Sequence, residues 1–271
     1  MRIRPPAVCG MFYEADPGRL RRQVDDCFAA ADAPADRRAF TAAVVPHAGL
    51  MYSGAVAACV YATVEIPRKV ILLGPNHTGR GRTAAIECSG AWHTPMGDVP
   101  IDGELAAALM AEGPMLEEDR RAHDREHSLE VQLPLLQAVR EDFSFVPICL
   151  SVPTLDQCEA IGRAIAAVVL ASSEPVGIFA SSDLNHYENQ QITLRKDFEA
   201  IEPILALDQA ALWQRVREED ISMCGSIPTA TMLAASKALG ATKGELLRHA
   251  TSGEVSGDYD AVVGYAAILI S

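Results

Sequence analysis

Hydrophobic positions along this chain fall into short unbroken runs and longer stretches with helical spacing. The runs TAAVVP (41–46) and KVILLG (69–74) are typical of buried strands, and further strands are expected at 83–88, 144–150, 176–181, 245–250 and 260–269. Helices are expected at 14–39, 53–65, 103–112, 126–140, 155–171, 195–217 and 226–239. Because strands alternate with helices and no linker divides the chain, the pattern predicts a single α/β domain over residues 1–271, with a mostly parallel or mixed central sheet flanked by helices.

A histidine follows each of the first two strands. His47 lies in PHAG and His77 in GPNH, 30 residues apart, which is about the length of one βαβ unit. Consecutive parallel strands often lie side by side, ~4.8 Å apart, so both imidazoles are expected at the carboxyl edge of the sheet, where open α/β sheets bind ligands. Two imidazoles at this edge can converge on one metal ion. The alternative is that each is a loop residue bonded to a backbone carbonyl.

A third polar cluster, FASSDLNHY (179–187), also follows a strand. It places Asp183 and His186 at the same edge, beside Ser181 and Ser182. The alternative for Ser182 or Asp183 is an N-cap, since both residue types cap helices well. A Ser-His-Asp hydrolase is disfavoured because no G-x-S-x-G elbow accompanies these residues.

A fourth cluster is DREHSLEVQLP (124–134). His127 and Glu130 are three residues apart and would share a helix face, and Glu126 and Glu130 are suited to orienting a metal-bound histidine. Pro134 is expected to kink this helix or mark a new start. The alternative is a solvated, charged helix face.

The remaining histidines and the cysteines carry less information. Cys224 in SMCGSIPTA precedes Ser226, a candidate helix cap, and a lone cysteine is usually a small buried hydrophobe. His93 is expected in a hairpin near the mouth of the site. We interpret His123 and His249 as structural or surface groups.

Composition narrows the class of protein. The chain has 36 Asp and Glu against 23 Lys and Arg, for a net charge of −13, which argues against nucleic-acid and membrane partners. Seven cysteines, an odd number with no C-x-x-C, fit reduced thiols better than a disulfide framework. With no apolar signal-like segment at the N-terminus, we expect a soluble, cytoplasmic protein.

Taken together, PHAG, GPNH, EHSLEVQLP, SSDLNHY, MCG and VVGYAA occur in an order that resembles the Memo family. The opening RPPAVCGMFYEAD is also similar to that family's N-terminus, so the resemblance covers nearly the whole chain. The bacterial and archaeal members are called AmmeMemoRadiSam system protein B. Their fold is similar to the catalytic subunit of class III extradiol dioxygenases.

The resemblance implies a metal centre. It makes His47 and His77 the histidine ligands and Cys224 the third ligand, with His186 as acid/base, Asp183 beside it and His127 facing the metal ligands or the substrate. It implies one mononuclear metal ion, and Fe(II) is the first candidate because the dioxygenases bind Fe(II). Cu and Zn are alternatives, since a thiolate replaces the dioxygenases' carboxylate and favours softer metals. In the family's C-G-R step, Ser226 takes the arginine's place here.

Several functions stay open on the sequence alone. The first is a dioxygenase-like oxidoreductase acting on an unknown small-molecule substrate with O₂. The others are a cleft that binds a peptide or small ligand, metal delivery to an AMME-type or radical-SAM partner, and a zinc hydrolase. Family resemblance suggests phosphotyrosine peptides as one ligand, and Arg80 and Arg82 are candidates to receive the anion.

Overall fold

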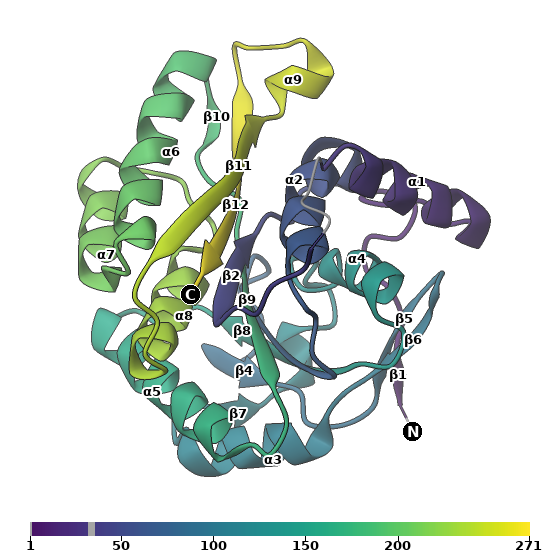
Figure 1. Cartoon of the computed structure of the whole chain (residues 1–271), viewed down its shortest axis with the longest axis vertical. Helices are drawn as coiled ribbons and strands as arrows, with labels where there is room; N and C mark the ends of the chain where they lie inside the picture. Colours follow the sequence, from purple (N-terminus) through teal and green to yellow (C-terminus); the bar gives the residue numbers. More distant parts are fainter. Residues whose placement is uncertain (1, 32–35) are drawn as a thin grey trace.

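A mixed β-sheet forms the centre of the chain (Figure 1). The computed structural model describes residues 2–31 and 36–271. Four parallel strands make up the middle of the sheet, in the order β2 (Ala42–Val45), β9 (Val176–Ser181), β3 (Lys69–Pro75) and β8 (Ser144–Leu150). Antiparallel strands extend both sides: β12 (Val262–Ile270) beside β2 and β4 (Ala84–Ile86) beside β8. The predicted α/β class with a mixed central sheet is confirmed.

The outer strands are short or lie off the main path. β10 (His186–Glu188) and β11 (Gly244–Thr251) both pair with β12, and β7 (Glu117–Glu118) pairs with β4. A separate small sheet contains β1 (Ile3–Arg4), β5 (Ala91–Thr94) and β6 (Gly97–Pro100). β5 and β6 form the hairpin that was predicted around His93.

Helices cover both faces of the sheet, because successive side chains of each strand point to opposite faces and both kinds are apolar. In β3, Leu73 belongs to the apolar cluster that contains residues of α3, α5, α6, α7 and α8, whereas Leu72 belongs to the cluster that contains residues of α1, α2 and α4. The helices are α1 (Pro17–Ala29), α2 (Leu50–Thr63), α3 (Gly103–Glu112), α4 (Gln132–Val139), α5 (Leu155–Ala171), α6 (Gln190–Leu205), α7 (Gln209–Glu218), α8 (Ser226–Ala238) and α9 (Gly253–Ser256), with a 3-10 turn, η1, at Arg120–Ala122. Strands buried on both faces explain why the sequence shows unbroken apolar runs and not alternation.

Three of the predicted helices differ from the structure by more than three residues at one end or more. The helix expected at 14–39 is α1, which begins after the Asp16 cap and ends at Ala29, and residues 32–35 lie outside the described residues. The helix expected at 126–140 begins only at Gln132, so Pro134 falls in its first turn, where proline is tolerated. The helix expected at 195–217 is two helices, α6 and α7, with Leu207 between them at a φ of 55°.

β2 and β3 are not neighbours, contrary to the prediction. β9 lies between them and pairs in parallel with both. The chain therefore passes from β2 to β3 across an open position in the sheet. That position is occupied by β9, about a hundred residues after β3 in the sequence. This insertion places the SSDLNHY segment between the PHAG and GPNH loops at the carboxyl edge.

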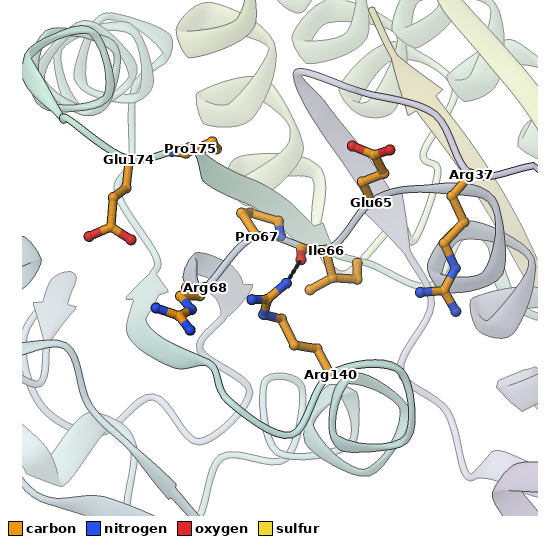
Figure 2. Close-up of a pocket in the computed structure, with 8 residues that line it drawn as sticks. All are labelled: Arg37, Glu65, Ile66, Pro67, Arg68, Arg140, Glu174 and Pro175. Carbon is orange, nitrogen blue, oxygen red and sulfur yellow. Dashed lines mark hydrogen bonds between the residues drawn. The ribbon is translucent and has the colours of Figure 1, made fainter.

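The opposite, amino edge of the same strands carries a pocket of about 480 Å³ (Figure 2). Its walls come from segments just before β2, β3, β8 and β9, and its lining residues are Arg37, Glu65, Ile66, Pro67, Arg68, Arg140, Glu174 and Pro175. Arg68 and Arg140 both pair with Asp142, and Arg140 also donates to the Ile66 carbonyl at 3.0 Å. Within the described residues, no helix is long and apolar enough to cross a membrane.

Candidate metal centre

A cleft of about 850 Å³ opens at the carboxyl edge of the parallel strands. His47, His77, His127, Asp183, His186 and Cys224 all line it, so the structure brings together the predicted metal ligands and the three predicted catalytic residues. They come from loops that follow β2, β3 and β9, from the segment before α4 and from the segment before α8. Residues as far apart as Phe12 and Tyr265 complete the wall.

His47 is held by its backbone and by its ring. Its N–H donates to the Asp183 carboxylate at 2.7 Å, and its Nδ1 lies 2.9 Å from Ser181 Oγ. The single hydroxyl proton of Ser181 is donated to the Ser128 carbonyl at 2.7 Å, and Gln132 Nε2 donates to the same oxygen. Ser181 Oγ must therefore accept a hydrogen bond from His47 Nδ1–H, which leaves His47 Nε2 unprotonated and able to bind a metal.

His77 is oriented by a buried carboxylate. Glu126 accepts hydrogen bonds from the His77 backbone N–H at 2.7 Å and from His77 Nδ1 at 2.8 Å, and also from the backbone N–H groups of His127 and Ser128. Burial alone would raise the pKa of Glu126, but the hydrogen bond and proximity of His77 outweigh it and lower that pKa to about 2. An ionised Glu126 fixes the Nδ1–H tautomer of His77 and leaves Nε2 as a ligand atom.

Cys224 approaches from the opposite side of the cleft, in the turn before α8. Its Sγ lies 3.3 Å from His47 Nε2. Gly225 permits this approach, since a Cβ at that position would lie 2.4 Å from the Ser181 carbonyl oxygen. Burial, followed by the negative charge of Asp183, raises the pKa of the Cys224 thiol far above its usual range. The thiol therefore keeps its proton, which it shares with His47 Nε2, until a cation replaces it.

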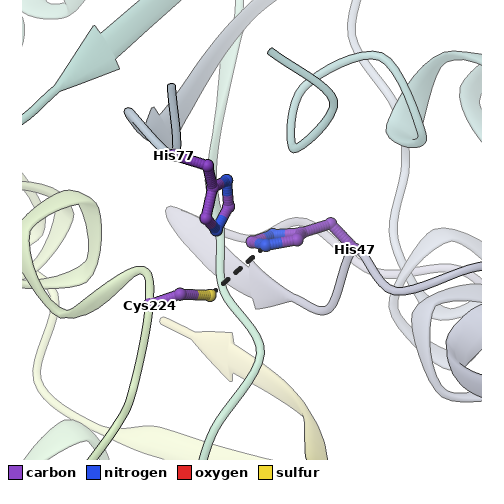
Figure 3. A group of neighbouring side chains, drawn as sticks. All are labelled: His47, His77 and Cys224. Carbon is purple, nitrogen blue, oxygen red and sulfur yellow. Dashed lines mark hydrogen bonds between the residues drawn. The ribbon is translucent and has the colours of Figure 1, made fainter. Parts of the chain in front are cut away.

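The three side chains form one donor set (Figure 3). One ligand atom from each of His47, His77 and Cys224 lies within 4.8 Å of the others, and the two imidazole rings are 5.2 Å apart at their centroids. Two ligands of one tetrahedral ion, each bound at about 2.1–2.3 Å, lie roughly 3.6 Å apart, close to the sulfur–nitrogen distance found here. Two imidazoles whose Nδ1 atoms are hydrogen-bonded to Ser181 and Glu126, together with a thiol, thus fit a single metal ion.

His186 lies on the rim of this donor set, at the start of β10. Its N–H donates to Ser222 Oγ at 2.7 Å, and its Nδ1 lies 2.9 Å from the Ser222 carbonyl oxygen. A carbonyl only accepts, so Nδ1 carries the proton and Nε2 is the basic atom. Ser222 itself is held by Asn185 Oδ1, which accepts from the Ser222 N–H and hydroxyl.

Asp183 and His127 occupy different surroundings. Asp183 is 4 % exposed, and burial raises the pKa of its carboxyl to about 6, although the N–H groups of His47 and Ala48 counteract this shift. Its contacts position the PHAG backbone, while the hydrogen bonds that orient His186 come from Ser222. His127 stacks on His77 with 4.5 Å between ring centroids, and burial lowers the pKa of His127 to about 4, so its ring is neutral at pH 7.

Several alternatives raised by the sequence are wrong. Ser182 and Asp183 cap no helix among the described residues, and neither Ser181 nor Ser182 hydrogen-bonds to His186 in that part of the chain. Ser226 is the first residue of α8, whose N-cap is Gly225. Glu126 and Glu130 are both fully buried, which excludes a solvated helix face.

Four residues predicted near the site also need correction. Glu130 does not orient a histidine; it binds Arg4 at 2.7 Å and accepts from Tyr13 and from two backbone N–H groups of the N-terminal segment. His93 pairs with Asp98 on the hairpin and does not line the cleft, nor do Arg80 and Arg82. His123 is buried below Trp92, and His249 binds Asp197, which agrees with their structural interpretation.

Sequence reasoning missed the groups that hold the site in place. Gln132 accepts from Tyr61 and donates to Ser181 and the Pro46 carbonyl, and Ser222 orients His186. Each lies in a motif already singled out, EHSLEVQLP and SMCG, so its sequence position was a usable signal. Phe12 and Met11 were also missed as cleft residues, because nothing local to the N-terminus indicates that Glu130 ties this segment to the site.

Comparison with known proteins identifies the family to which the chain is similar. A family model described as Memo-like protein matches residues 4–269. The MEMO1 family protein of Methanopyrus kandleri is 45% identical over 277 residues, covering 98% of both chains, and that of Methanosarcina barkeri is 43% identical over 269 residues, covering 99% of this chain and 100% of the relative.

Among solved structures, an uncharacterized protein from Escherichia coli K12 superposes with a TM-score of 0.55 at 12% identity, covering 84% of this chain and 99% of that one. At this identity the match speaks for the fold alone. The family model and the archaeal relatives, by contrast, extend over nearly the whole sequence. The chain therefore belongs to the Memo-like protein family.

Proposed function

We propose that this chain is a metal-dependent oxidoreductase that binds one metal ion through His47, His77 and Cys224 and acts on a small molecule in the cleft. The observation that carries the proposal is the convergence of the three ligand atoms within 4.8 Å at the floor of the cleft. Two hydrogen bonds support it. His47 Nδ1 is bonded to Ser181 and His77 Nδ1 to Glu126, so the Nε2 atom of each ring remains available to a metal ion.

The donor set indicates which ions to test. Two imidazoles and a thiolate suit iron, copper or zinc and disfavour magnesium or calcium, which prefer oxygen ligands. Fe(II) is our first candidate because three protein ligands leave positions for substrate and O₂. When bound, iron or copper would supply a change of oxidation state together with Lewis acidity.

The other cleft residues would handle protons and orientation. His186 Nε2 would accept a proton from the substrate and later return it, with Ser222 holding the ring in the required tautomer. Neutral His127 would present a flat, uncharged face beside His77. Asp183 would keep His47 in place through the backbone.

The metal site is tested by anaerobic metal analysis of freshly purified protein. We expect one equivalent of metal in the wild type and less than a tenth of that in the His47→Ala, Cys224→Ala double variant. His93→Ala, Cys88→Ala is the matched control, since neither residue lines the cleft. Equal metal content in the two double variants would contradict the proposal.

The redox activity needs a separate test. O₂ uptake by the Fe(II)-loaded protein would be screened against phenols and other small aromatic molecules. For any substrate found, His186→Ala is expected to lower turnover at least 100-fold while leaving the metal content unchanged. A protein that binds metal but consumes O₂ no faster than free Fe(II) with every compound would contradict the enzymatic part of the proposal.

A further inference from the structure

We infer that the cleft takes a planar aromatic molecule that carries no negative charge, and that it favours one bearing a cationic group. This inference concerns the substrate class of the site in the proposed function and rests on it.

A series of ring contacts forms one wall of the cleft and reaches the proposed metal ligands. The Phe12 and His127 rings are 4.8 Å apart at their centroids, His127 and His77 are 4.5 Å apart, and His77 and His47 are 5.2 Å apart. The rings of His127 and His77 are nearly parallel, at 23°. A flat ligand that reached the metal ligands would stack against this wall, as aromatic rings prefer at separations of about 4.5–7 Å.

Large apolar side chains are exposed at the mouth of the same cleft. Met11 is 72 %, Met51 62 % and Tyr187 77 % exposed, and all three line the cleft. They come from the N-terminal segment, from α2 and from β10, so no single element accounts for them. Exposed apolar groups that gather at one concave site are typical of ligand binding.

Tyr187 is held there at a cost in backbone energy. Its φ is 61°, in the left-handed region that a bulky residue rarely occupies. This conformation directly follows His186, and the two rings meet edge to face with 5.6 Å between centroids. An exposed aromatic side chain kept in a strained conformation beside the proposed acid/base suggests a contact with substrate.

The charged residues that line the cleft favour a cationic ligand over an anionic one. No Lys or Arg lines the cleft among the described residues, whereas Asp183 and Asp258 do. Arg82 is engaged with Glu117 at 3.3 Å, and neither it nor Arg80 lines the cleft. A phosphate or carboxylate in the cleft would find no Lys or Arg side chain among the described lining residues, while Asp258 and the net charge of −13 attract cations.

The experiment compares three phenols that differ only in the charge of one substituent. Tyramine is the cation, 4-ethylphenol the neutral probe and 4-hydroxyphenylacetate the anion. Binding would be measured by calorimetry on metal-free protein and on Zn(II)-loaded protein, where no redox turnover interferes. We expect tyramine to bind at least 10-fold more tightly than 4-hydroxyphenylacetate, with 4-ethylphenol between them, in one or both forms.

Two variants separate charge from ring contact. Asp258→Lys is expected to reduce the preference for tyramine over the anion at least fivefold, while Glu112→Lys, the same charge change on α3 away from the cleft, leaves it unchanged. Tyr187→Ala should weaken all three probes by a similar factor. Equal or tighter binding of the anion, or no binding of any probe up to millimolar concentration, would overturn the inference. Because the metal content of these variants is measured separately, this failure would be distinguished from failure of the metal site.

Discussion

A pocket lies at each end of the parallel strands, and both are formed by the segments that flank these strands. The two pockets differ in the burial of the polar residues around them. At the amino edge, the pocket of Figure 2 is lined by arginines and glutamates that lie near solvent, and Asp142 there is 57 % exposed while paired with Arg68 and Arg140. At the carboxyl edge, Glu126, Ser181 and Gln132 are each 1 % exposed or less, and every one of them supports a cleft histidine directly or through one hydrogen bond.

This difference shows what distinguishes a candidate site from a depression between loops. Exposed ion pairs are screened by water and contribute little to structure, and their side chains are free to rearrange. Buried polar groups must all be paired, so their hydrogen bonds fix tautomers and orientations. A hollow at the end of a sheet is therefore informative when polar groups behind it are buried and aimed into it.

The largest expected effect compares the carboxylates of the two edges. Glu126→Gln replaces an oxygen with an amide donor among four N–H donors, and we expect it to lower the free energy of unfolding by about 3 kcal/mol, in the range seen when one partner of a buried ionic group is removed. Metal affinity should fall at least 10-fold. Asp142→Asn, at the exposed amino edge, should leave both quantities unchanged. Chemical denaturation and metal titration would measure the stability and the metal affinity of both variants. A smaller loss of stability for Glu126→Gln than for Asp142→Asn would contradict the expected difference between the two edges.

The next effect concerns pH and the buried His123, which lies in the segment that supports the carboxyl edge. Burial, with a smaller contribution from the charge of Arg4, lowers the pKa of His123 from 6.5 to about 4. Between these values the unfolded chain takes up the proton and the folded chain does not, so stability is lost as pH falls from 6.5 to 4. At about 1.4 kcal/mol per pH unit the loss reaches about 3 kcal/mol.

His123→Phe should remove this share of the pH dependence, leaving a shallower decline that reflects His47 and His127, whose pKa values burial also lowers. His93→Phe, on the exposed hairpin, is the control and should leave the profile unchanged. Denaturant titrations of metal-free protein from pH 7 to pH 4 would test this. Parallel profiles for wild type and His123→Phe would refute it.

A smaller effect is expected from glycines placed at the two edges. An alanine Cβ at Gly225 would lie 2.4 Å from the Ser181 carbonyl oxygen, so Gly225→Ala should displace the Cys224 turn, lower stability by about 2 kcal/mol and weaken metal binding. At Gly177, near the amino edge, the nearest atom is Pro67 Cγ at 3.1 Å, and Gly177→Ala should cost no more than about 1 kcal/mol, with metal binding intact. Equal metal affinities for the two variants would show that Gly225 is not needed for the approach of Cys224.

The smallest effect on stability is expected at Tyr187. Glycine occupies positive φ without strain, so the gain from Tyr187→Gly offsets the entropy that glycine loses on folding, and stability should change by less than about 1 kcal/mol. The same variant should bind aromatic probes more weakly. A large loss of stability in thermal melts would show that the tyrosine ring is a structural contact and not part of the substrate wall.

The fold was largely predictable because buried strands give unbroken apolar runs that differ clearly from helices, and β8 and β9 have the predicted bounds. The strand order was not, because no local pattern shows that β9 fills the gap between β2 and β3. The positions of the site residues followed from strand ends and family resemblance together. What remained beyond the sequence were long-range partners such as Glu130 with Arg4, which are set by tertiary packing.

The long separation of the site residues along the chain also has a consequence for how the protein is made. His47 and its proposed fellow ligand Cys224 are separated by 177 residues, and Tyr265 in the last strand completes the cleft wall. A ribosome must therefore release nearly the entire chain before the three donor atoms can meet. At the proposed site, a metal ion would therefore be bound only after the chain has been synthesised as far as Cys224 and has folded.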